Sequence, residues 1–237
     1  MRTHLRRGLH LRCCLSCVLI LSVNGICSDI VTAGYQTIVA RDVVSCNSLN
    51  GVWIPDCCIA CENNKDASGA VILENILFSN ITSAVLSSIV NSTSKFSLLP
   101  GVYQGADNCG INVPNYASRM IGVCGALYTS INCNNSLYHF KVMGYSLELN
   151  GLTLINGFNA DNGGCVSMMT PGAVLMLTDS KLIHCISYQN GGAINMNNVD
   201  MSQQSQSASV SITGKSSIEN CSAKLNGGAL YLAVGSM

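Results

Sequence analysis

The sequence has few charged and few aromatic side chains, and it has no excess of charge of either sign. Charged residues make up 10% of the 237 residues, against roughly 25% in an ordinary globular domain. Aromatic residues make up 5%, and the formal net charge is zero. A chain without a basic excess cannot neutralise the phosphates of a nucleic acid, so we expect no nucleic-acid partner. Gly, Ser and Asn are abundant instead, and such a neutral polar surface suits stacked turns better than charged helices.

The N-terminal segment contains an apolar run that is too short to cross a membrane. Residues 1–12 are basic and precede an apolar run of 11 residues, 13–23, whereas a spanning helix needs about 20. This order is typical of a secretory signal peptide, and we predict cleavage after Cys27, which gives residues 1–27 as the signal. An uncleaved membrane anchor is the alternative. Without the leader, eight basic and twelve acidic residues remain, a net charge of −4.

Cysteine is abundant in the rest of the chain. Ten of the 14 cysteines follow residue 27, an even number that is typical of a protein folded in an oxidising compartment. Residues 28–80 form a Cys-rich N-terminal cap region, in which Cys57, Cys58 and Cys61 could be zinc ligands or halves of disulfides. We favour disulfides, because no second CxxC and no pair of histidines follows at a suitable spacing.

Four Asn-x-Ser/Thr triplets are acceptor sequences for N-linked glycans in a secreted protein. Their asparagines are Asn80, Asn91, Asn134 and Asn220.

A short helix followed by a strand is predicted after the cap region. The apolar residues Ile81, Val85, Leu86 and Ile89 have helical spacing and follow Asn80, a suitable N-cap. An apolar strand over 96–103, interrupted by a Pro-Gly turn, comes next.

The most informative feature is a repeat marked by three Asn-Gly-Gly triplets. The triplets are Asn162, Gly163 and Gly164; Asn190, Gly191 and Gly192; and Asn226, Gly227 and Gly228. The first glycines lie 28 and 36 residues apart, and we assign the eight extra residues to a surface loop at 201–208. Nine positions before each first glycine lies Leu154, Leu182 or Ile218, and six positions before lies Gly157, Cys185 or Cys221.

Alternation after each triplet predicts strands with one buried face. The residues expected to point inward are Val166, Met168, Ile194, Met196, Leu230 and Leu232. Those expected to point outward are Cys165, Ser167, Ala193, Asn195, Ala229 and Tyr231. Leu147 and Leu149 fall one position out of step with Val174 and Met176, and with Val210 and Ile212 at the 36-residue spacing. This slip predicts a β-bulge or an irregular first coil.

Such repeats cannot bury their apolar faces alone, so successive repeats must stack. The sequence therefore predicts an all-β fold, a right-handed parallel β-helix solenoid over residues 81–237 with a short N-terminal capping helix and clear repeats at 147–237. The glycines would form corners with positive φ, and the stacked Asn amides would hydrogen-bond to one another.

Residues 191–194 and 227–230, with 163–166 as a less faithful copy, resemble the repeats of polymorphic outer membrane proteins of chlamydiae and related pectin-lyase-like β-helix domains. The Phe-x-x-Asn element of those repeats is not kept, because Leu, Leu and Ile replace its Phe and Gly, Cys and Cys replace its Asn. Residues 99–105 also resemble the opening turn of extracellular β-helix proteins. The resemblance implies surface display and adhesion.

Catalytic chemistry is not expected. A polysaccharide lyase or hydrolase needs clustered carboxylates, whereas the acids of the repeats align with other residue types. Asp161 aligns with Gln189 and Leu225, and Asp179 aligns with Gly151 and Lys215. His184 aligns with Asn156 and Asn220, which predicts a turn residue in a polar column. Cys185 and Cys221 align as well, and we expect small apolar filler there, with a thiol stack or a disulfide as alternatives.

Two classes of function remain open. The first is a secreted or cell-surface adhesion or structural module without cofactors, whose partners are host or neighbouring-cell surface molecules or glycans. The second is an extracellular polysaccharide-binding or polysaccharide-degrading protein. The last repeat would leave an open rung, so we also expect self-association through that end.

Overall fold

The computed structural model describes residues 33–36, 51–54, 57–73, 76–91, 95–113, 118–144, 146–170, 172–197 and 209–233. The predicted signal peptide and the predicted loop at 201–208 lie outside these residues. The described ranges include all three Asn-Gly-Gly triplets.

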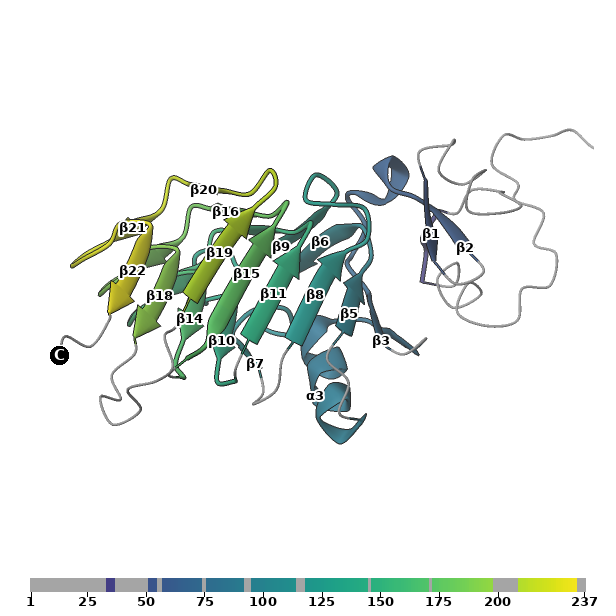
Figure 1. Ribbon diagram of the computed structural model, residues 1–237. Helices are drawn as coiled ribbons and strands as arrows, with labels where there is room; N and C mark the ends of the chain where they lie inside the picture. Colours follow the sequence, from purple (N-terminus) through teal and green to yellow (C-terminus); the bar gives the residue numbers. More distant parts are fainter. Residues whose placement is uncertain are drawn as a thin grey trace, which may run out of the picture.

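The described residues of the N-terminal segment form short antiparallel strand pairs, a 3-10 helix and an α-helix. Strands β1 (Gly51–Ile54) and β2 (Cys57–Ala60) pair antiparallel, and the 3-10 helix η1 (Glu62–Asn64) follows. Strands β3 (Val71–Leu73) and β4 (Ile76–Phe78) form a second antiparallel pair. Helix α3 (Ile81–Asn91) then packs against β3, β4 and the later strand β7 (Figure 1).

The chain then runs five times past the same sheets, and we call each run a pass. Pass 1 contains β5 (Lys95–Leu98), β6 (Gly101–Gln104) and β7 (Ile111–Val113). Pass 2 contains β8 (Ser118–Gly122), β9 (Thr129–Asn132) and β10 (Phe140–Val142). Pass 3 contains β11 (Ser146–Asn150), β12 (Thr153–Ile155), β13 (Phe158–Asn159) and β14 (Val166–Met168).

The last two passes repeat the pattern of pass 3. Pass 4 contains β15 (Val174–Thr178), β16 (Lys181–Ile183), β17 (Ile186–Ser187) and β18 (Ile194–Asn197). Pass 5 contains β19 (Ser209–Thr213), β20 (Ser217–Glu219), β21 (Ser222–Ala223) and β22 (Leu230–Ala233).

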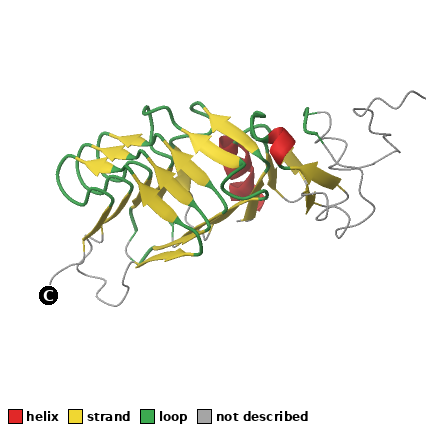
Figure 2. Cartoon of the chain, turned by 90° about the horizontal axis from the view of Figure 1, so that it is seen from above, coloured by secondary structure: helices red, strands yellow, loops and turns green. Residues whose placement is uncertain are grey.

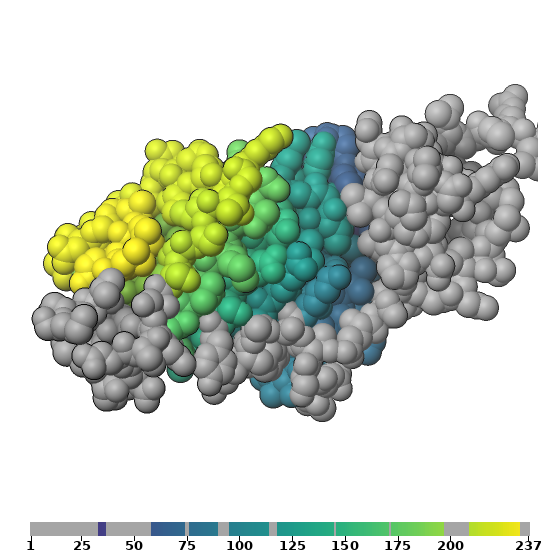
Figure 3. All heavy atoms as spheres, viewed as in Figure 1, coloured from purple at the N-terminus to yellow at the C-terminus, as the bar shows by residue number. Residues whose placement is uncertain are grey.

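Successive passes are joined by parallel strand pairing in four sheets. Sheet I has the order β19-β15-β11-β8-β5-β3-β4, sheet II β20-β16-β12-β9-β6, sheet III β22-β18-β14-β10-β7, and sheet IV β13-β17-β21. Every pair that joins two passes is parallel, whereas β3 pairs antiparallel with β4 and β5. Figure 2 shows the strands of neighbouring passes side by side, and in Figure 3 the passes succeed one another along the molecule. The prediction of an all-β chain with parallel sheets is confirmed.

The strand register locates the eight extra residues of the longer repeat. Val166 pairs with Ile194, an offset of 28 residues. Val174 pairs with Ser209, an offset of 35, whereas Lys181 pairs with Ser217, an offset of 36. Seven extra residues therefore precede β19, and the eighth lies in the turn between β19 and β20. The prediction of one insertion at 201–208 was wrong in this detail.

The predicted bulge at the start of pass 3 is absent from β11 and its neighbours. Leu147 pairs with Leu175 and Leu149 pairs with Leu177, and all four side chains are buried. The apparent slip arose because the 36-residue offset was applied to β15 and β19, whose real offset is 35.

The inward positions of the strands form one continuous core. Val166, Met168, Ile194 and Met196 are buried as predicted. The residues between them were expected outside, but four of these are buried as well: Cys165, Ser167, Ala193 and Asn195. Alternation predicts which way a side chain points within a strand. It does not predict whether other segments cover an outward-pointing side chain, or which way the residue before the strand points.

Helix α3 is present where the helical spacing predicted it, but its buried face differs from the predicted one. Ile81 and Val85 are buried, together with Ala84, whereas Leu86 and Ile89 are more than half exposed. The predicted cap is present, because the Ser83 N–H donates to Asn80 Oδ1 at 2.8 Å.

Candidate functional site

The Asn-Gly-Gly triplets lie in register at one corner of passes 3, 4 and 5, between sheets IV and III. Asn190 Nδ2 donates to Asn162 Oδ1 at 3.1 Å, and Asn226 Nδ2 donates to Asn190 Oδ1 at 2.9 Å. The first glycines, Gly163, Gly191 and Gly227, have φ values of 73°, 67° and 64°. These values lie in the left-handed region, where a side chain would be strained.

The second glycines of passes 3 and 4 are needed because the backbone of the next pass is so close. A Cβ on Gly164 would overlap the carbonyl oxygen of Gly192, and a Cβ on Gly192 would overlap that of Gly228. Gly228 lies in the last pass, and the nearest atom to its Cβ position is 3.9 Å away. The corner is thus a close backbone stack whose outer surface carries amides.

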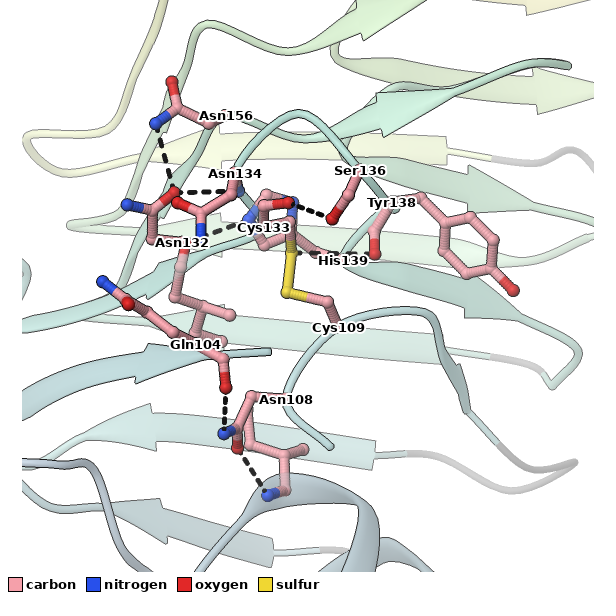
Figure 4. The surroundings of a disulfide bond; sticks show 12 residues. Gln104, Asn108, Cys109, Asn132, Cys133, Asn134, Ser136, Tyr138, His139 and Asn156 are labelled. Carbon is pink, nitrogen blue, oxygen red and sulfur yellow. Dashed lines mark hydrogen bonds between the residues drawn. A yellow bond between two sulfur atoms is a disulfide. The ribbon is translucent and has the colours of Figure 1, made fainter. Parts of the chain in front are cut away.

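A second polar column lies at the turn after sheet II. Asn156, His184 and Asn220 have φ values of 56°, 53° and 52°, so they occupy equivalent left-handed turns. Asn156 Nδ2 donates to Asn132 Oδ1 at 3.1 Å, which extends the column to pass 2 (Figure 4). His184 is exposed, as a turn residue in this column should be.

The acidic side chains of the repeats lie on separate elements and have local partners. Glu148, on the outer face of sheet I, pairs with Arg119 at 2.9 Å. Asp179 Oδ1 accepts from the Lys215 N–H at 2.8 Å. Asp179 follows Thr178, which pairs with Thr213, so Asp179 aligns with Gly214, and the predicted alignment with Lys215 was wrong.

Two other acidic side chains in the described repeats also have local partners. Asp161 Oδ1 accepts from Gln189 Nε2 at 3.4 Å, and Glu219 Oε1 accepts from the Ser217 hydroxyl at 2.6 Å. Within the described ranges, no three His, Cys, Asp or Glu residues are grouped so that they could hold a metal ion.

An exposed stack of side chains beside the corner was not anticipated from the sequence. The rings of Phe158 and Tyr188 meet edge to face with centroids 5.1 Å apart, and Lys224 Nζ lies 5.8 Å from the Tyr188 ring centroid. The three residues come from passes 3, 4 and 5. Tyr188 and Lys224 are 36 residues apart, which is the spacing of the second repeat, and this was the signal in the sequence that could have predicted their contact.

Disulfides join segments that lie far apart in the sequence. Cys61 bonds to Cys124, which ties the N-terminal segment to pass 2. Cys109 bonds to Cys133, and this bond joins passes 1 and 2 (Figure 4). Cys58 is also disulfide-bonded, so the disulfide interpretation of Cys58 and Cys61 is confirmed and the zinc alternative is wrong for them.

The third disulfide corrects two predictions. Cys165 bonds to Cys185, with Cα atoms 5.4 Å apart, and joins passes 3 and 4. Cys165 was expected to face outward and Cys185 to be apolar filler. Cys165 instead precedes β14 at the corner, where its side chain turns into the core. Gly157 leaves room for it, since a Cβ there would lie 2.7 Å from Cys165 Sγ.

His139 occupies the place of Cys165 at the boundary between passes 2 and 3. It precedes Phe140, the partner of Val166 in β14, and it is fully buried. His139 Nε2 lies 2.9 Å from the Ile131 carbonyl oxygen, so this nitrogen carries the proton, and the buried Nδ1 has no hydrogen-bond partner. Burial lowers the pKa of His139 from 6.5 to about 4, although its backbone hydrogen bonds oppose the shift. The imidazole is therefore neutral at pH 7.

Cys221 is not in a disulfide and lies one pass beyond Cys185. Its Sγ accepts from the Cys185 N–H at 3.3 Å, and its thiol donates to the Glu219 carbonyl oxygen at 3.2 Å. The side chain is partly exposed, and burial raises the pKa of its thiol.

The predicted glycan acceptors differ in their surroundings. Asn134 and Asn220 are exposed and lie in left-handed turns. Asn80 is partly buried, and its side-chain oxygen caps α3. Asn91 is the last residue of α3.

Two observations bear on the compartment. The disulfides are typical of an oxidising, extracellular environment. No helix in the described ranges is both long and apolar enough to span a lipid bilayer.

Comparison with known proteins gave no match to a family model, to a curated protein or to a solved structure.

Proposed function

We propose that the chain is a secreted or cell-surface adhesion or structural module, built as a right-handed parallel β-helix over residues 81–237 and without a catalytic role. The pairing of successive passes at the same positions in four sheets supports the β-helix, because a β-helix chain returns to the same sheets in register on every turn. The basic and apolar leader and the disulfides support export.

The outward columns of amides and hydroxyls carry the proposal of adhesion. Asn162, Asn190 and Asn226 form one such column, and Thr178 and Thr213, whose hydroxyls are 3.1 Å apart, belong to another. A repeated array of neutral donors and acceptors offers many weak contacts to a polar partner and no site for chemistry. Glycans or surface proteins of a host or neighbouring cell have matching chemistry.

Polysaccharide binding is the second candidate, and the Phe158, Tyr188 and Lys224 stack favours it. Aromatic rings beside hydrogen-bonding groups are common where carbohydrates bind. However, the Tyr188 ring is already in contact with a ring from pass 3 and a cation from pass 5. This arrangement suits a stabilising stack better than an open platform for a sugar ring.

An adhesion assay tests the proposal. Beads coated with the secreted chain are applied to cultured cells and to immobilised neutral polysaccharides. We expect retention above that of albumin-coated beads, and a loss for Asn190→Ala and Asn226→Ala. Leu127→Ala, which changes an 81% exposed side chain at a different corner, is the control and should bind normally. Binding no better than albumin, or sustained product release from a polysaccharide such as polygalacturonate, would contradict the proposal.

We also propose that pass 5 mediates self-association. Among the described strands, β19, β20, β21 and β22 lie at the edges of their sheets, and Ile212 and Leu232 are nearly half exposed. Unpaired strand edges with an apolar inner face favour pairing with another chain. Light scattering of this chain should show association, and a polar capping repeat appended after residue 237 should restore a monomer. A stable monomer without the cap would contradict this part.

A further inference from the structure

Three cysteines from consecutive passes lie beside one another. Ile186 pairs with Ser222 in sheet IV, so the preceding residues, Cys185 and Cys221, are neighbours across the boundary between passes 4 and 5. The Cys185 N–H donates to Cys221 Sγ at 3.3 Å. Cys185 is at the same time bonded to Cys165 of pass 3. The Cys221 thiol thus lies beside a residue that forms one half of a disulfide.

The three sulfur-bearing residues differ in access to solvent. Cys165 and Cys185 are fully buried, whereas Cys221 is partly exposed in the last pass. Solvent can therefore take the proton of Cys221, while an external thiol has no route to the buried disulfide. The neighbouring thiol is the nucleophile best placed to reach it.

We propose that Cys221 attacks the Cys165–Cys185 disulfide, so that the chain exchanges between two disulfide isomers. The Cys221 thiol loses its proton, and the thiolate forms a bond to Cys185 Sγ. The bond between Cys185 and Cys165 breaks, and its electron pair leaves on Cys165 Sγ, which takes up a proton. One disulfide and one thiol are present before and after, so no oxidant or reductant is consumed.

The exchange moves the cross-link by one pass. In the first isomer a disulfide joins passes 3 and 4, and Cys221 of pass 5 forms no disulfide. In the second isomer passes 4 and 5 are joined instead. The position in pass 4 that is equivalent to Cys165 is Ala193, so Cys221 lacks the cysteine partner that Cys185 has in pass 3. The position of the Cys185 disulfide therefore determines whether passes 3 and 4 or passes 4 and 5 are cross-linked.

Proteolysis separates the three cysteines cleanly. Trypsin cleaves after Lys141, Lys181, Lys215 and Lys224, which places Cys165, Cys185 and Cys221 on peptides 142–181, 182–215 and 216–224. The intact secreted chain, without denaturant, is incubated dilute at pH 7, 8 and 9, quenched in acid, unfolded, and alkylated before digestion. Mass spectrometry then identifies the linked peptides and the alkylated cysteine.

The first isomer links 142–181 to 182–215 and leaves Cys221 alkylated. We expect the second isomer, which links 182–215 to 216–224 and leaves Cys165 alkylated, to form faster by about tenfold per pH unit, because the thiolate is the nucleophile. Cys221→Ser should abolish it, and the Cys109–Cys133 bond is the internal control that should not change. The first linkage alone at pH 9, or a link between 142–181 and 216–224, would overturn the proposal.

Discussion

The boundary between passes 3 and 4 and the boundary between passes 4 and 5 have the same backbone pairing and different covalent chemistry. Sheet III joins both boundaries in register, through Val166 with Ile194 and through Ile194 with Leu230. The first boundary carries the Cys165–Cys185 disulfide, whereas the equivalent residues of the second are Ala193 and Cys221. The fold of a pass is therefore set by its strands and corners, and one side chain decides whether it is cross-linked.

The boundary between passes 2 and 3 has a third arrangement. His139 stands where Cys165 stands one pass later, and Gly157 stands where Cys185 stands. A Cβ on Gly157 would lie 2.8 Å from His139 Nδ1, so the imidazole fills the space that a disulfide takes in the next boundary. The same inward position thus accepts a disulfide, a neutral histidine or a small side chain.

The largest expected effect comes from the second glycine of the corner. Gly192→Ala places a Cβ against the Gly228 carbonyl oxygen, so passes 4 and 5 must separate. We expect a loss of about 4 kcal/mol or more in the free energy of unfolding. Gly228→Ala is the matched control, because its Cβ would make only an ordinary contact, at 3.9 Å, and should change stability by only about 0.5 kcal/mol. Urea denaturation measures both, and equal losses would show that the corner is not closely stacked.

Removing the Cys165–Cys185 disulfide should lower the free energy of unfolding somewhat less than Gly192→Ala does. The double variant Cys165→Ala/Cys221→Ala opens a cross-link between residues 20 apart in sequence and leaves Cys185 without a neighbouring thiol, and we expect it to lose about 3 kcal/mol in the free energy of unfolding relative to Cys221→Ala. Cys221→Ala removes a thiol outside any disulfide in the last pass and should cost about 1 kcal/mol or less. If the two variants unfold at the same urea concentration, the cross-link does not distinguish the two boundaries.

Acid should weaken the boundary that depends on His139. Its pKa of about 4 in the folded chain lies below the ordinary value of 6.5, so between these values the unfolded chain binds more protons and stability falls as the pH falls. The loss from pH 7 to pH 4 should be about 3 kcal/mol. His139→Leu should flatten this dependence in urea denaturation, while His184→Asn, which changes the exposed turn histidine, should retain it. A dependence that persists in His139→Leu would assign it to other groups.

The sequence was informative where a feature recurs once per pass. The Asn-Gly-Gly triplets indicated the corners because glycine adopts a positive φ without strain and recurs at the same place in each repeat. The residues Leu154, Leu182 and Ile218 indicated strands in sheet II, which pair as their spacing implied. The alignment of His184 with asparagines indicated a turn because these residues tolerate the left-handed region.

Features set by contacts between passes could not be read in the same way. Cys165 and Cys185 lie in different positions of the repeat, so no column in the alignment paired them. The burial of His139 depends on the absence of a side chain at Gly157, one pass away. Leu86 and Ile89 have helical spacing, but the face of α3 that is buried depends on how β3, β4 and β7 contact it.

The most direct test of the stacked passes is a new disulfide at the second boundary. Because residues 193 and 221 stand in the same relation as Cys165 and Cys185, Ala193→Cys should bond to Cys221 and stabilise the chain by about 2 kcal/mol. Digestion with trypsin and then chymotrypsin, which cleaves after Tyr188, separates Cys185, position 193 and Cys221 for mass spectrometry. The β-helix account predicts a link between position 193 and Cys221 with Cys165–Cys185 intact. Free thiols at both 193 and 221 after oxidation would contradict it.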